Sequence, residues 1–225
     1  SEPIGVLFID CAKRWGVHPA ILRAFTPHLV EGSLVIQQDF KGVLVYLALH
    51  MYQLRASLEP VHTPDGGSVG FITNTPVERS TLDGLWTPTD VDRLGRDALI
   101  RAAADWFDAH APEPLSHWIW LAGAAEMDWA VDPAFIERCI QNAKAGLDGW
   151  LAGTDDPIRA HAHRENWNSE VGRLSAILRD ASLDGLAQSA SEELGRPVAG
   201  LSGSQSQPQA DGFRPPRRRV ADQQA

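Results

Sequence analysis

The sequence has few of the features that mark a secreted or membrane-spanning protein. It contains two cysteines in 225 residues, Cys11 and Cys139, which lie far apart and offer no disulfide framework. No apolar run approaches the length of about eighteen residues that a membrane helix needs, and the most apolar stretch, residues 43–49, is far shorter. No signal peptide is visible either. We therefore expect a cytoplasmic protein that makes no contact with a membrane.

An excess of basic charge is also absent. The formal net charge is −9, and residues 196–225 contain five arginines and two aspartates (+3), which leaves about −12 on the remainder. Phosphate binding needs a basic face, so this acidic body argues against a nucleic-acid partner. The three consecutive arginines at 217–219 are expected to be part of a solvated tail.

Two motifs that would define a chemistry are missing as well. No Gly-x-Ser-x-Gly motif occurs, so a serine hydrolase has little support. No glycine-rich loop lies between a predicted strand and a predicted helix, because the glycine-containing stretches at 65–67 and 200–203 fall in a hairpin and in the tail. No residue of this sequence can therefore be assigned to holding a nucleotide-like cofactor.

The first part of the chain alternates between strand-like and helix-like segments. Residues 4–9 and 33–36 are short, continuous apolar runs, which are typical of parallel strands covered on both faces. Residues 19–29 and 42–57 carry apolar side chains at helical spacing, and Pro19 marks the start of the first of these helices. Strand, helix, strand and helix thus follow one another, which predicts an α/β sheet.

A hairpin is predicted next. Residues 60–63 and 68–73 favour strands, and the sequence Pro-Asp-Gly-Gly at 64–67 between them is a strong turn signal, so the two strands should be antiparallel. Residues 1–78 are accordingly predicted to form an α/β domain whose parallel strands are closed by an antiparallel hairpin.

The remainder reads as helical and then disordered. Good N-terminal caps and apolar periodicity predict an all-α accessory module over 87–188. Its helices are expected at 87–110, 115–130, 132–151 and 154–186. The module would recognise a small-molecule acceptor or form a homodimer. Its tryptophans are expected to pack in its core. His161 and His163 are expected on the surface, because residues two apart on a helix point to different sides. Serine, glutamine, glycine, proline and arginine dominate 189–225, which predicts a disordered tail.

Candidate site residues follow the two predicted parallel strands. Asp10 ends the first strand, and Gln38 and Asp39 end the second. Neighbouring strands lie about 4.8 Å apart, so two carboxylates and an amide oxygen at these ends are suited to binding Mg²⁺. Lys13 follows in the loop after Asp10, and a general base there would need a pKa of roughly 7–8. The alternatives are that Asp10 caps a turn, that Asp39 caps the next helix, and that Lys13 is an ordinary surface lysine.

The residues around these strand ends resemble a known family. Residues 7–15 (Leu-Phe-Ile-Asp-Cys-Ala-Lys-Arg-Trp) and 32–40 (Gly-Ser-Leu-Val-Ile-Gln-Gln-Asp-Phe) are similar to class I, Rossmann-like S-adenosylmethionine-dependent methyltransferases that act on small-molecule hydroxyl groups. In metal-dependent members, an aspartate after the fourth strand binds the metal, a lysine three residues later is the base, and an acidic–amide pair ends the fifth strand. Asp10 and Lys13 match, whereas Gln38 and Asp39 occur in the reverse order.

The resemblance covers about residues 4–76 and implies the C-terminal half of a methyltransferase sheet. It implies S-adenosylmethionine as methyl donor and a small or sugar-like hydroxylated acceptor, with Mg²⁺ as the metal if the chain resembles the metal-dependent members. The donor-binding half would then lie upstream of Ser1, and the chain would be a fragment. Two alternatives remain open: a non-catalytic interaction protein with a degenerate methyltransferase-like domain, and a nucleotide-dependent sugar enzyme with the same sheet.

Overall fold

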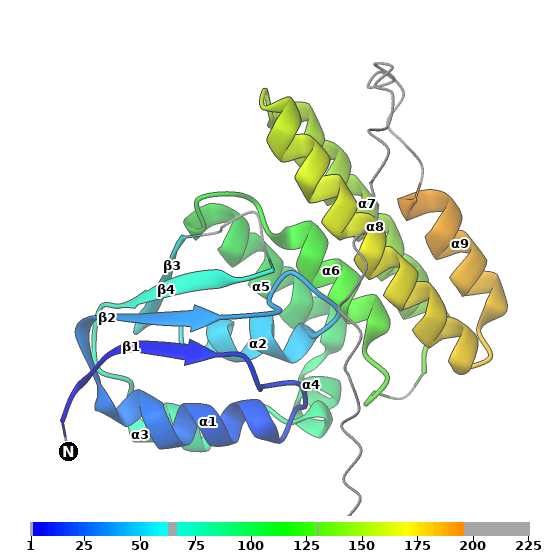
Figure 1. Ribbon diagram of the computed structural model, residues 1–225. Helices are drawn as coiled ribbons and strands as arrows, with labels where there is room; N and C mark the ends of the chain where they lie inside the picture. The colour runs from blue at the N-terminus through cyan, green and yellow to red at the C-terminus, as the bar shows by residue number, and fades with distance from the viewer. Residues whose placement is uncertain (1, 63–66, 130, 196–225) are drawn as a thin grey trace, which may run out of the picture.

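A four-stranded mixed sheet forms one side of the molecule (Figure 1). The computed structural model describes residues 2–62, 67–129 and 131–195. The spatial order of the strands is β1 (Ile4–Ile9), β2 (Leu29–Gln37), β4 (Val69–Thr73) and β3 (Leu58–His62). β1 and β2 are parallel, and β4 runs antiparallel to both β2 and β3. The predicted α/β class and the antiparallel pairing of the last two strands are confirmed; most of the predicted turn, residues 64–66, lies outside the described residues.

The helices that follow β1 and β2 lie on the same face of the sheet. They are α1 (Val17–Phe25), which continues into a 3₁₀ turn (Thr26–His28), and α2 (Val45–Gln53). The two helices touch through buried side chains, because Nδ1 of His18 lies 3.0 Å from Nδ1 of His50. Leu7, Ile9, Val35 and Phe71 point from the strands into this helical layer and are buried. The core of the molecule therefore sits on one side of the sheet.

The opposite face of the sheet is apolar over β1, β2 and β4, and β1 is open on it. Val6 and Phe8 of β1 are 61% and 56% exposed. The strand register places Val6 beside Leu34 and Phe8 beside Ile36, and Leu34 in turn lies beside Ile72 of β4. The continuous apolar run of β1 predicts cover on both faces, but no described helix covers this one. Successive residues of a strand point to opposite faces, so the side chains of this run are divided between the buried face and the open face.

The remaining helices continue the core without a break. They are α3 (Arg79–Asp83), α4 (Pro88–Leu94), α5 (Arg96–His110), α6 (Ser116–Ala125), α7 (Pro133–Gly153), α8 (Pro157–Asp180) and α9 (Asp184–Leu194). Helices α5 and α6 pack against α2, and α7, α8 and α9 form an outer bundle beside them (Figure 1). One hydrophobic cluster includes side chains from the strands and from α9. The sequence predicts a domain boundary between residues 78 and 87, which stays a prediction; the hydrophobic cluster contains described residues from both sides of it.

Backbone conformation explains where the predicted helices are interrupted. Gly95 has φ +98°, which ends α4 and starts α5 inside the predicted 87–110 helix, and Ser182 has φ +61° between α8 and α9. Residues 189–194 were predicted as part of the tail but belong to α9, because Ala190 and Leu194 are buried in the bundle. Residues 196–225, the rest of the predicted tail, lie outside the described residues.

None of the helices in the described parts of the chain is both long enough and apolar enough to cross a membrane.

Candidate functional site

The carboxyl ends of β1 and β2 meet, as the strand pairing requires. The amide of Gln38 donates a hydrogen bond to the carbonyl of Ile9 over 3.0 Å. Immediately beyond these strand ends, Nζ of Lys13 lies 2.7 Å from Oδ2 of Asp39. The structure therefore brings together two of the predicted site residues, which are 26 positions apart in the sequence.

Asp39 adopts a backbone conformation that is uncommon for residues other than glycine. Its φ is +58°, in the left-handed region, and such residues often occur at functional sites. The turn has little spare room, because a Cβ added to Gly42 would lie 3.2 Å from the carbonyl oxygen of Asp39 and 3.4 Å from Oε2 of Glu170. The amide of Lys41 also donates to the carbonyl of Gly67, at 3.0 Å. The turn after β2 is thus fixed from both sides.

The Lys13–Asp39 pair determines the charge of Lys13. The hydrogen bond that Lys13 donates to Asp39 and the negative charge of that carboxylate raise the pKa of Lys13, and the charge of Asp10 adds to the effect. Lys13 is therefore protonated at neutral pH. A general base needs the opposite shift. The role of Lys13 as a base stays a prediction, and in the structure as it stands this side chain is a cation.

The predicted metal ligands do not form a ready cation site. Asp10 is exposed, Gln38 is partly buried, and the carboxylate of Asp39 is already paired with an ammonium group. Within residues 2–62, 67–129 and 131–195, no three His, Cys, Asp or Glu side chains converge as metal ligands would. The assignment of Asp10, Gln38 and Asp39 to a metal stays a prediction, and no chemical step below relies on it.

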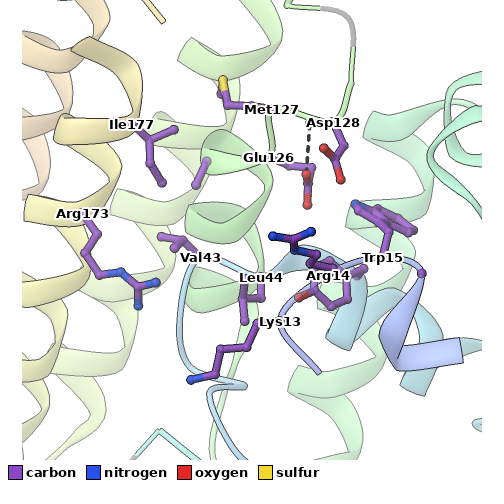
Figure 2. A pocket seen from close by; sticks show the side chains of 13 residues that line it. Lys13, Arg14, Trp15, Val43, Leu44, Glu126, Met127, Asp128, Arg173 and Ile177 are labelled. Carbon is purple, nitrogen blue, oxygen red and sulfur yellow. Dashed lines mark hydrogen bonds between the residues drawn. The ribbon is translucent and has the colours of Figure 1, made fainter. Parts of the chain in front are cut away.

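A cavity of about 640 Å³ opens beside the Lys13–Asp39 pair (Figure 2). Its walls come from the loop after β1, from α2, from the loop after α6 and from α8. A smaller cavity of about 320 Å³ contains Asp39 and shares Lys13, Leu44 and Arg173 with the larger one. The loop after β1 is held in place by Tyr46, whose hydroxyl donates to the carbonyl of Ala12 over 2.8 Å. The predicted site residues Lys13 and Asp39 thus border a space of the size of small-molecule pockets.

Arg173 is positioned by a carboxylate on its own helix. Its Nη1 donates to Oε1 and Oε2 of Glu170 at 3.1 and 3.0 Å. Glu170 is buried, whereas Arg173 borders both cavities. Helix α8, which the sequence predicts as part of an accessory module, therefore contributes a cation to the space at the strand ends.

Glu126 is a candidate functional residue that the sequence reasoning missed. It follows α6 and lines the larger cavity, where its Oε1 accepts a hydrogen bond from the amide of Asp128 at 3.1 Å. Burial raises its pKa to about 7, helped by the charge of Asp128 and opposed by that hydrogen bond and by the side chain of Trp15. The sequence predicts a continuous helix over 115–130, so the turn at Glu126 was not expected. The only signal for it in the sequence was a pair of acidic residues after a strongly apolar helix.

Buried polar groups also tie the outer helices to the sheet layer. Lys41, in the turn after β2, forms a buried ion pair with Glu113, which also binds Arg159 of α8. His163 was predicted on the surface but is buried, because its Nε2 lies 2.9 Å from Nε2 of His117 on α6. Its neighbour His161 is exposed, as predicted. These contacts fix the position of α8, and hence of Arg173, relative to β1 and β2.

Comparison with known proteins gives no family. No protein-family model, no curated protein and no solved structure matches this chain. Function is therefore argued from the site alone.

Proposed function

We propose that this chain forms the acceptor side of an S-adenosylmethionine-dependent methyltransferase that transfers a methyl group to a small or sugar-like hydroxylated acceptor. The observation that carries the proposal is the pair of adjoining cavities at the carboxyl ends of β1 and β2: Lys13 and Arg173 border both, and Asp39 borders the smaller one. Open α/β sheets bind their ligands outside the carboxyl ends of their strands. The cavity volume suits a small molecule.

The arrangement of the sheet supports this proposal. A parallel pair of strands followed by an antiparallel hairpin is the arrangement expected for the C-terminal half of a Rossmann-like methyltransferase sheet. Among the described residues β1 has no partner on its outer edge, and its apolar face at Val6 and Phe8 is uncovered. Parallel strands are usually covered on both faces. We propose that a donor-binding segment outside this sequence pairs with β1 and supplies the glycine-rich loop.

The charge of Lys13 gives it a defined part in such a transfer. A protonated lysine stabilises the negative charge that develops on an acceptor oxygen as its proton is lost. Asp39 holds the ammonium group at the strand ends through the 2.7 Å contact. Lys13 therefore serves the proposed reaction as an electrostatic stabiliser, and the proton must go to another group.

The proposal is tested with the protein expressed from its complete reading frame. Transfer of a labelled methyl group from S-adenosylmethionine is measured on glucose, glucuronate and catechol as acceptor probes. Lys13→Ala should lower kcat by on the order of 10²–10³-fold while the protein stays folded, the usual cost of losing one oxyanion donor. Lys144→Ala, which removes a lysine paired with Asp148 on α7, is the matched control and should leave the rate unchanged. Absence of transfer to any of these acceptors argues against the proposal.

A second candidate is a non-catalytic interaction protein, which the uncovered apolar face of β1 favours. Contiguous exposed apolar surface often marks a protein–protein contact. In that case Lys13→Ala would have no effect on partner binding, whereas a polar substitution of Phe8 would weaken it. The two candidates thus respond to different substitutions.

A further inference from the structure

We propose that Glu126 is the group that accepts the proton from the acceptor hydroxyl. This inference rests on the proposed methyl transfer and assigns a catalytic residue to the same cavity. It departs from the sequence-based expectation, which gives the role to Lys13.

The position of Glu126 fits this role. It lies at the end of α6, on a wall of the cavity formed by a different segment from the one that carries Lys13. Figure 2 shows the carboxyl groups of Glu126 and Asp128 close together near Arg14 and Trp15, while the Lys13 ammonium points away from them. An acceptor bound against this wall of the cavity would lie beside the Glu126 carboxylate.

The hydrogen bonding of Glu126 orients its carboxyl group. Its Oε1 accepts from the amide of Asp128 over 3.1 Å, in a short turn that follows the buried end of α6. Asp128 itself is exposed, whereas Glu126 is partly buried. Of the two carboxylates at this wall, Glu126 is therefore the one that is shielded from water and held by the backbone.

The other acid–base candidates nearby are less suitable. Lys13 is protonated through its pairing with Asp39. Burial and neighbouring acidic charges raise the pKa of the Tyr46 hydroxyl above its usual range, and that hydroxyl already donates to the Ala12 carbonyl. The titratable and charged groups that line the cavity with Glu126 are Lys13, Arg14, Tyr46, Asp128 and Arg173.

The protonation equilibrium of Glu126 supports the assignment. Burial raises its pKa to about 7, with a further contribution from the charge of Asp128. A general base is most effective when its pKa lies near the working pH. The ionised form is needed, so the rate should rise as the pH rises through about 7 and then level off.

The proposed step balances in atoms and charge. The acceptor hydroxyl gives its proton to the Glu126 carboxylate, and its oxygen forms a bond to the methyl carbon of S-adenosylmethionine. The bond between that carbon and the sulfonium sulfur breaks, and its electron pair stays on sulfur as a neutral thioether. The products are the methyl ether, S-adenosylhomocysteine and protonated Glu126, which then loses its proton to solvent.

The test is the pH dependence of methyl transfer by the protein from the complete reading frame, using the acceptor among glucose, glucuronate and catechol that reacts fastest. Glu126→Gln should lower kcat by on the order of 10²-fold or more and abolish the acidic limb near pH 7. Glu137→Gln, an exposed glutamate on α7, is the matched control and should leave the profile unchanged. Carbon-13 NMR of the glutamate carboxyl groups should show one that titrates near pH 7 and is missing in Glu126→Gln.

A second variant tests the inference if Glu126→Gln folds poorly. Asp128→Asn removes a negative charge that raises the pKa of Glu126, so the acidic limb should move to lower pH. If Glu126→Gln retains the rate and the limb of the wild type, the inference is overturned while methyl transfer stands. If the wild type transfers no methyl group, the proposed function fails and this inference fails with it.

Discussion

Buried charge in this protein is concentrated at one junction. Lys41 and Glu113 are 3% and 5% exposed and form an ion pair, and Arg159 binds the same carboxylate from α8. Removing one partner of a buried ion pair leaves an uncompensated charge in a poorly solvated place, which costs more than the intact pair contributes. This junction sits next to the turn that presents Asp39, so its integrity also bears on the site.

Glu113→Gln should therefore destabilise the fold strongly. Because the substitution removes the carboxylate that pairs with Lys41 inside the buried junction, we expect the free energy of unfolding to fall by about 3 kcal/mol. Urea denaturation followed by circular dichroism measures it. Glu137→Gln on the surface of α7 should change the stability by less than about 0.5 kcal/mol. A loss of similar size in both variants would contradict the special role of Glu113.

At the scale of elements, two histidine pairs join neighbouring helices. His18 and His50 connect α1 to α2, and His117 and His163 connect α6 to α8. Burial lowers the pKa of all four, to about 4 for His50 and about 3 for His163. His163 also stacks on Trp150, with ring centroids 3.8 Å apart. These helix contacts depend on neutral imidazoles.

The stability of the fold should consequently fall in mild acid. For His50 and His163, the unfolded chain takes up the proton near pH 6.5, whereas the folded chain does so only near pH 4 and pH 3, so stability is lost as the pH drops through this interval. Each histidine contributes a slope of up to about 1.4 kcal/mol per pH unit. His163→Gln should reduce the slope between pH 6 and about 4 by this amount, and His161→Gln should not. An unchanged slope in His163→Gln would show that its imidazole is not held neutral.

Two glycine-to-alanine substitutions distinguish the effect of backbone strain on stability from the effect of helix propensity. Gly95 has φ +98° between α4 and α5, and an added Cβ would meet no other atom, so Gly95→Ala tests strain alone. We expect it to cost about 1 kcal/mol or more. Gly172 lies inside α8, also with open space, and Gly172→Ala should stabilise by about 0.5–1 kcal/mol. Thermal unfolding distinguishes the two signs, and stabilisation by Gly95→Ala would contradict the observed conformation.

The elements that the sequence could predict are those with strong local signals. The apolar run of β1, the paired strands β3 and β4, and the caps of α4, α7 and α8 are all readable from short patterns. Three features could not be predicted from short patterns: the turn at Glu126, the burial of His163 and the contribution of Arg173 to the cavity. Each depends on helices that come together only in three dimensions. Asp39 was predicted at the strand end. Its ion pair with Lys13 was not predicted, because Lys13 was expected to act as a base.

For the molecule as a whole, the most unusual feature is the open face of β1. Val6, Phe8, Leu34, Ile36 and Ile72 line this side of the sheet, and the first two are exposed. Within the described residues, the helices that cover the sheet lie on its other side. An open edge strand with an apolar face is a site for pairing with further chain or for aggregation.

A polar residue in place of Phe8 on the edge strand β1 should change the behaviour of the chain in isolation. Phe8→Ser should reduce the binding of a hydrophobic dye and slow aggregation of the 225-residue chain, with little effect on stability because the side chain is exposed. Leu94→Ser replaces another exposed apolar residue, on α4, and is the control. Equal dye binding by Phe8→Ser and the wild type would show that this face is covered in solution.

The most direct test of the account is calorimetric titration of the protein from its complete reading frame with S-adenosylmethionine and, separately, with UDP-glucose. A methyltransferase site at the ends of β1 and β2 predicts saturable binding of S-adenosylmethionine and none of the nucleotide sugar. Binding of UDP-glucose without S-adenosylmethionine would assign the sheet to sugar chemistry, and binding of neither would contradict the methyltransferase account.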